Sequence, residues 1–172
     1  AEAYRKGISN FEHEELYTIA IDAMMQRREL DFGSPPNLSI YEQFDYYPSS
    51  IGKSVSWTQE QSIADYALGK MAEEIGDTQD AEHLLSRSTN WQNLYDPEIG
   101  FIHARDEQGN FEELISASVW SDEFTEGNAR QYLWLAPHAP EDLFTLLGGN
   151  SIALERLTEM MEEMVDADGE VP

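Results

Sequence analysis

The densest run of side chains that could do chemistry lies at residues 124–134. Within it, residues 126–134 supply one carboxyl group, two amides and two aromatic rings, on Glu126, Asn128, Gln131, Tyr132 and Trp134. Carboxylates and amides hydrogen-bond to hydroxyl groups, and aromatic faces offer apolar surface to the C–H face of a sugar. The run therefore suits a carbohydrate site. On the residues alone a structural interpretation is favoured, in which both rings are core and Glu126 complements the positive end of a helix.

Other kinds of active site find no support in the sequence. None of the four histidines, His13, His83, His103 and His138, has the spacing of a zinc ligand to another, and there is no cysteine. Neither a glycine-rich phosphate loop nor a Gly-x-Ser-x-Gly elbow occurs. Residues 166–169 lack the third acidic ligand and the closing Glu of a calcium loop. The sequence thus predicts no metal site among its own residues.

The net charge of the chain argues against two classes of binding partner. Asp and Glu number 34 against 10 Lys and Arg, which gives a net charge of -24. Such a surface repels nucleic acid and anionic membranes, so we expect neither as a partner, and no apolar run approaches the ~18 residues of a membrane span. Two explanations of this acidic composition compete: the surface of a halophilic protein, and a fragment whose basic partner segments are missing. The halophilic explanation is favoured. Aromatic residues at 11% and hydrophobic residues at 41% argue against disorder.

The elements that position these residues are predicted to be helices. Apolar residues recur with helical spacing in four segments. They are Leu16, Ile19, Ala20, Ala23 and Met24; Ile63, Ala67, Met71 and Ile75; Ala81, Leu84, Leu85, Ser88 and Trp91; and Leu154, Leu157, Met160, Met161 and Met164. The second segment is expected to begin near Ser56, which has capping-box spacing to Gln59, and to end at residues 76–77. The second and third helices then form a hairpin of antiparallel neighbours.

The remaining segments contain turn signals. Residues 31–50 are rich in Gly, Pro, Asn and Ser and predict a long loop. A small irregular or β-hairpin excursion is expected near residues 96–118. A further helix is predicted at residues 125–135, and a short one begins at Pro140 and stops at Gly148 and Gly149. The predicted fold class is all-α, with helical hairpins that belong to a toroid or to an α-hairpin array.

Four short motifs, in order over residues 45–150, resemble glycoside hydrolase family 92. Residues 125–129, followed by Gln131, Tyr132, Trp134 and His138, are similar to its signature TEGNAWQYxWxxPHD. Residues 46–65 resemble its GYVP and SVSKTLEYAYDDW segments. Residues 93–101 are similar to NLFDPETGF, and residues 147–149 to LMGG.

The resemblance implies a fold, an activity and a set of roles. Family members are calcium-dependent, inverting exo-α-mannosidases whose (α/α)6 toroid packs on a β-sandwich. Residues 1–172 would be a partial toroid, without the β-sandwich domain and the C-terminal part of the toroid. Glu126 would be the general acid, whereas the catalytic base and the calcium ligands are expected outside this chain. The expected partners are a mannose-containing glycan and the rest of the parent chain, and the family alone suggests secretion or a periplasmic location.

The resemblance also implies residues that contact the substrate. They are Glu60, Asp65, Arg105, Asn128 and Gln131. We expect Glu126, Asn128 and Gln131 near one end of the helix pairs, on a concave surface shared with Glu60 or Asp65.

Several positions depart from the family pattern. Arg130 replaces the signature Trp, Trp57 a Lys, Ala64 an Asp and His103 an Arg. Two alternatives therefore stay open: a non-catalytic acidic helical domain that binds a glycan or a protein, and an inactive relative that only binds sugar. Glu126 itself presents a conflict, because a general acid needs a raised pKa and a helix start favours the ionised form.

Overall fold

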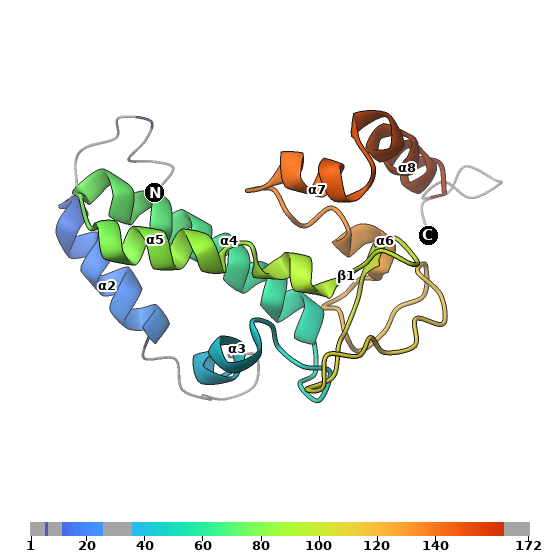
Figure 1. Ribbon diagram of the computed structural model, residues 1–172, viewed down its shortest axis with the longest axis horizontal. Coiled ribbons are helices and arrows are strands. Elements are labelled where there is room, and N and C mark those ends of the chain that lie inside the picture. The colour runs from blue at the N-terminus through green and yellow to red at the C-terminus, as the bar shows by residue number, and fades with distance from the viewer. Residues whose placement is uncertain (1–5, 7–11, 26–35, 164–172) are drawn as a thin grey trace.

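A computed structural model describes residue 6 and residues 12–25 and 36–163 (Figure 1). Within these ranges there are seven α-helices, one 3-10 helix and one small sheet. Their bounds are α2 (His13–Met25), α3 (Leu38–Phe44), α4 (Ser54–Ile75), α5 (Thr78–Arg87), η1 (Asn90–Leu94), β1 (Tyr95–Asp96), β2 (Phe101–Ile102), α6 (Ala129–Tyr132), α7 (Pro140–Leu146) and α8 (Asn150–Glu163). The all-α prediction is confirmed.

Helices α4 and α5 form the predicted hairpin and lie side by side in Figure 1. Helix α4 stops at Gly76, whose φ of 84° is left-handed, and the Asp77 carboxylate then caps α5 by accepting from the Asp80 N–H. The two helices approach closely at Gly69, where an added Cβ would lie 2.8 Å from Cγ of Leu85. A side chain at this position would therefore push α5 away from α4.

The predicted start of the second helix near Ser56 agrees with the structure to within two residues, but its predicted capping box is wrong, and so is part of the predicted loop at residues 31–50. Helix α4 begins at Ser54, and its N-cap Lys53 makes no side-chain cap. Ser56 and Gln59 are buried inside the helix and bond to residues far along the chain. The predicted loop at residues 31–50 contains α3, which Asn37 caps by accepting from the Ser39 N–H, and residues 31–35 lie outside the described part. A spacing pattern shows which groups could cap a helix, but packing decides where the helix starts.

The predicted excursion is confirmed as a short antiparallel hairpin. Strands β1 and β2 pair Tyr95 with Ile102 and Asp96 with Phe101, and an isolated bridge joins Arg105 to Phe111. The main core is built where this hairpin meets η1, α6, α7 and α8. Its largest buried side chains include Trp91, Leu94, Ile102, Phe124 and Leu133.

The apolar stripes of the two outer helices are only partly buried. Helix α2 packs on α4 through Tyr17 and Met24, whereas Leu16 and Ile19 of its predicted stripe are exposed. Helix α8 packs through Ala153, and Leu154, Leu157 and Met161 are exposed. The periodicity identified helices correctly, but it does not show which face another element covers. Met164 lies outside the described residues.

Candidate active site

Glu126 stands on a strained turn at the surface. Its φ of 52° is left-handed, a conformation that costs a residue with a Cβ about 1–2 kcal/mol. Its side chain is exposed. Left-handed residues other than glycine gather at functional sites, where the surrounding structure holds them in place. The backbone geometry thus marks Glu126 among the residues of its run.

The chain on either side holds this turn in place. The Thr125 N–H donates to Oγ of Ser56 on α4 at 2.7 Å. The Tyr132 hydroxyl donates to the Thr125 carbonyl at 2.6 Å, which closes the turn against α6. Gly127 packs so tightly that an added Cβ would lie 2.7 Å from the Tyr132 ring. The position after Glu126 therefore has no room for a side chain.

Asn128 and Gln131 form a reciprocal capping box at the start of α6. Oδ1 of Asn128 accepts from the Gln131 N–H at 3.1 Å, and Oε1 of Gln131 accepts from the Asn128 N–H at 3.2 Å. Nδ2 of Asn128 also donates to the Ser118 carbonyl. These bonds give both amides a positioning role for the Glu126 turn, and their predicted contact with a substrate stays a prediction.

The predicted helix over residues 125–135 is much shorter in the structure. Helix α6 covers only Ala129–Tyr132, and turns follow it. Gln59 of α4 donates from Nε2 to the carbonyls of Tyr132 at 2.8 Å and Leu135 at 3.2 Å. Because a side chain occupies these carbonyls, the helix is capped after little more than one turn.

The first turns of helix α4 therefore hold residues 125–135, which include Glu126, in place. Ser56 and Gln59 bind both ends of residues 125–135, and Glu60 follows Gln59 with an exposed side chain. A contact between Glu60 and a substrate stays a prediction. Sequence reasoning missed Ser56 and Gln59 as positioning residues. The available signal was the run of polar side chains in the first turns of a predicted helix, which the structure shows to be buried.

Asp65 lies in the interior and not at a surface. It is fully buried, and its two carboxylate oxygens accept from Nε and Nη2 of Arg87 at 2.8 and 2.7 Å. Gln61 donates to the same carboxylate at 2.7 Å. Burial alone would lower the pKa of Arg87, but hydrogen bonding and charge from Asp65 outweigh it and raise that pKa. This position does not support the predicted contact of Asp65 with a substrate, because the carboxylate faces Arg87.

Arg105 braces the excursion. Its guanidinium donates to the carbonyls of Gly109 and Asn93, and it lies 4.6 Å from the centroid of the Phe111 ring. Arg105 thus has a structural role, because it connects two loops, and a role in substrate binding stays a prediction.

His103 lies at a position where the family pattern has an Arg. Its side chain is buried, and Nε2 lies 3.3 Å from a carboxylate oxygen of Asp96.

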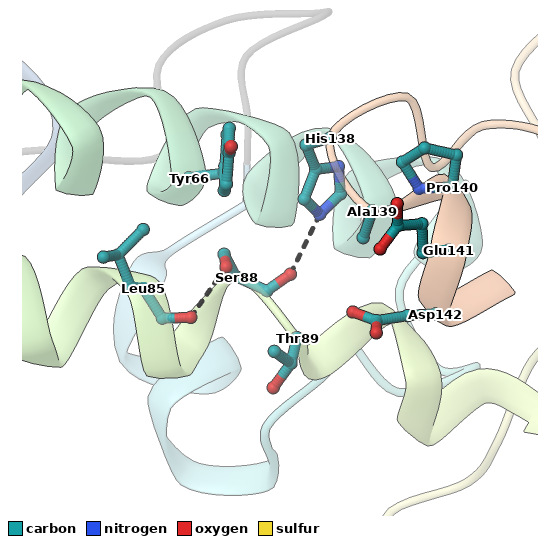
Figure 2. Close-up of a pocket in the computed structure, with 9 residues that line it drawn as sticks. All are labelled: Tyr66, Leu85, Ser88, Thr89, His138, Ala139, Pro140, Glu141 and Asp142. Carbon is teal, nitrogen blue, oxygen red and sulfur yellow. Dashed lines mark hydrogen bonds between the residues drawn. The ribbon is translucent and has the colours of Figure 1, made fainter. Parts of the chain in front are cut away.

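A separate cavity of about 410 Å³ lies between α4, α5 and α7 (Figure 2). Its lining residues are Tyr66, Leu85, Ser88, Thr89, His138, Ala139, Pro140, Glu141 and Asp142. Tyr66 lies ten positions after Ser56, or about 15 Å along the helix axis. This cavity is therefore distinct from the Glu126 turn.

His138 ties the segment after α6 to the end of α5. Figure 2 shows its ring above Ser88, where Nε2 donates to the Ser88 carbonyl at 3.0 Å. A carbonyl only accepts, so the neutral ring carries its proton on Nε2. Nδ1 is buried without a partner among the described residues. Burial lowers the pKa of His138, and the Ser88 carbonyl and Asp142 oppose this shift only in part.

This pKa predicts a loss of stability in mild acid. Since the folded-state pKa lies below the unfolded value of 6.5, the unfolded chain binds the extra proton first. The contribution of His138 is complete above pH 6.5 and declines as the pH falls towards the folded-state pKa. Its slope cannot exceed about 1.4 kcal/mol per pH unit. Urea unfolding between pH 7.5 and 5.5 should show a steeper decline for the unmodified protein than for His138→Gln, and parallel curves would contradict the assignment.

The described residues do not form a metal centre. Within residues 12–25 and 36–163, no three His, Asp or Glu side chains are grouped so that they could hold a metal ion. The chemistry that this arrangement offers is one exposed carboxyl group on a rigid turn. Such a group can donate a proton to a substrate, or accept one from it, when another surface of the protein holds the substrate against it.

Comparison with known proteins assigns this helical domain to a class of hydrolases. Residues 1–171 match the model of the glycosyl hydrolase family 92 catalytic domain, a longer span than the motifs alone indicated. The chain therefore belongs to glycosyl hydrolase family 92, and the resemblance seen in the sequence is confirmed. A secreted glycosidase of Arthroderma benhamiae, described as uncharacterized, is 25% identical over all of this chain and 26% of its own length.

Solved structures agree with this assignment. An inverting family 92 mannosidase of Bacteroides thetaiotaomicron matches with a TM-score of 0.84 and 30% identity, over 90% of this chain and 21% of that one. A family 92 α-mannosidase of the same organism, in complex with mannoimidazole, matches with a TM-score of 0.76 and 23% identity, over 97% of this chain and 21% of that one. The latter likeness concerns the fold alone. The chain thus spans about a quarter or less of these relatives.

The toroid prediction is confirmed at the level of the fold, because the neighbouring structures are family 92 (α/α)6 domains. None of the helices described here has the length and apolar character needed to cross a membrane.

Proposed function

We propose that this chain is part of the catalytic module of a longer, inverting exo-α-mannosidase that removes terminal α-linked mannose from glycans. The observation that carries the proposal is the exposed Glu126 on a left-handed turn, held by Ser56 and Tyr132, in a chain of this family. The mannosidase names of the neighbouring structures support the choice of sugar.

In this mechanism Glu126 is the general acid. It protonates the leaving oxygen while a second carboxylate, expected elsewhere in the longer protein, activates a water on the opposite face of the sugar. Inverting enzymes hold the two carboxyl groups ~6.5–9.5 Å apart, which leaves room for that water.

Calcium and secretion belong to the same proposal. The described residues do not fit a calcium site, so the ligands would come from other parts of the longer protein and no step here uses the ion. The curated relative described as secreted supports an extracellular location.

The test follows the anomeric proton of the sugar product. The full-length protein, supplied with calcium, should hydrolyse an α-mannoside, and proton NMR should detect β-mannose before mutarotation. The 172-residue chain alone should show no turnover, because it lacks the expected base. If α-mannose is released first, inversion is wrong. Saturable mannoside binding by the full-length protein without hydrolysis would favour the alternative of a binding module.

A further inference from the structure

Trp120 is an exposed aromatic residue six positions before Glu126. Its exposed fraction is 66%, whereas every other aromatic side chain within residues 12–25 and 36–163 is buried or half-buried. Tryptophan combines a large apolar face with an N–H donor, and it is enriched where proteins bind other molecules. The exposure of this ring therefore indicates a contact with a molecule or a segment outside the described residues.

The two aromatic rings that the sequence assigned to a sugar site are engaged in packing. The centroid of the Tyr132 ring lies 5.0 Å from that of the Phe124 ring, and the Trp134 side chain packs against the main core. Both rings are half-buried. Trp120 is therefore better placed than either of them to offer an open aromatic face to a sugar at Glu126.

Trp120 and Glu126 belong to one closed loop, residues 118–128. Nδ2 of Asn128 donates to the Ser118 carbonyl at 3.2 Å, which joins the two ends of the loop. Trp120 lies two positions after one end, and Glu126 lies two positions before the other. The same hydrogen bond therefore helps to position both side chains.

The loop is also fixed to the start of α4. The backbone N–H of Lys53 donates to the Asp122 carbonyl at 2.8 Å, and the Val55 N–H donates to the Glu123 carbonyl at 3.2 Å. Between the ring and the carboxyl group, residues 121–124 form a turn that a backbone hydrogen bond of 3.3 Å closes. The exposed ring thus stands on a backbone that is already ordered, and binding a ligand costs little loop entropy.

We propose that Trp120 stacks on the leaving-group sugar, which is the sugar from which the terminal mannose is cleaved. This inference rests on the proposed function of Glu126. As the general acid, Glu126 contacts the oxygen that stays with the leaving-group sugar, and a ring on the same loop is placed to reach that sugar. The cleaved mannose must also face the second carboxylate, which is expected elsewhere in the longer protein. Trp120 therefore selects for substrates that have a sugar ring on the leaving side.

The test compares an α-linked mannobiose with methyl α-mannoside on the full-length protein with calcium. Both substrates need protonation, but only the disaccharide has a leaving-group sugar. Trp120→Leu should lower kcat/KM for mannobiose about tenfold, mainly by raising KM, and change kcat/KM for methyl α-mannoside by less than about twofold. Trp120→Phe keeps an aromatic face and should recover most of the loss. Ile115→Ala alters a side chain that is 90% exposed outside the closed loop, and it should leave both substrates unaffected.

A binding measurement separates this inference from the mannosidase proposal. Calorimetric titration of mannobiose into full-length Glu126→Gln should give a Kd that rises about tenfold when Trp120→Leu is added. Hydrolysis by the unmodified protein with equal effects of Trp120→Leu on both substrates overturns the role of Trp120 alone. Binding that depends on Trp120 without any hydrolysis supports that role and overturns the mannosidase proposal, and absence of both binding and hydrolysis overturns both. A melting temperature lower by more than about 4 °C in Trp120→Leu would show that another segment covers the ring, which also overturns the inference.

Discussion

Glu126→Gln in the full-length protein should slow hydrolysis of unactivated α-mannosides by about 100- to 10,000-fold, the usual contribution of a general acid or base. Gln keeps the size of the side chain and the left-handed turn, but it has no acidic proton to give to the leaving oxygen. Initial rates on an α-linked mannobiose, measured with calcium present, provide the readout.

An activated aryl mannoside separates proton donation from other roles. Its leaving group departs without protonation, so the same variant should lose far less activity on it. Glu14→Gln makes the same chemical change at an exposed side chain of α2 and should leave both rates unchanged. Equal losses on the two substrates would remove Glu126 from the acid role, and loss in the Glu14 variant would point to a general effect of charge.

Arg87→Met should lower the free energy of unfolding by about 3–5 kcal/mol, because it leaves the buried Asp65 carboxylate without the guanidinium that pairs with its charge. The side chains of Arg87 and Asp65 are only 5% and 0% exposed. Met has a similar length and fills the space, so the loss reports the missing charge and hydrogen bonds more than a cavity. Urea unfolding of the protein, followed by circular dichroism, measures it.

A surface ion pair supplies the matched control. Lys53 and Asp122 meet at 2.7 Å with side chains 40% and 85% exposed, so Lys53→Met should cost less than about 1 kcal/mol. Asp65→Leu combined with Arg87→Met should recover part of the loss, since no unpaired charge then remains in the interior. If Arg87→Met costs no more than Lys53→Met, the buried pair does not have the structural role assigned to it.

Much of the secondary structure could be predicted from the sequence. Residues 76–77 ended one helix and began the next, Pro140 started α7, and residues 96–118 contained the expected hairpin. These features depend on local chemistry, such as a left-handed glycine, a proline without an N–H, or a turn residue. Local chemistry acts over a few positions and is therefore readable in one sequence.

The candidate site was predicted only in part. The motif pointed to Glu126, but the roles of Ser56, Gln59 and Asp65 depend on partners that lie 69, 73 and 22 positions away. Ser56 and Gln59 have the spacing of a capping box, and the same groups serve as braces once a second segment lies against them. Spacing identifies what a side chain could bond, whereas the partner is chosen by packing.

The sequence by itself determined the family, the helical class and the identity of the carboxyl group proposed as the acid. Only the tertiary structure decided that Glu126 is exposed on a left-handed turn, that Asp65 is an interior ion-pair partner, and that Trp120 is exposed on the closed loop that carries Glu126. The physical reason is that burial, backbone strain and loop closure arise between elements. They depend on which helix covers which face, a property that helical periodicity leaves undetermined.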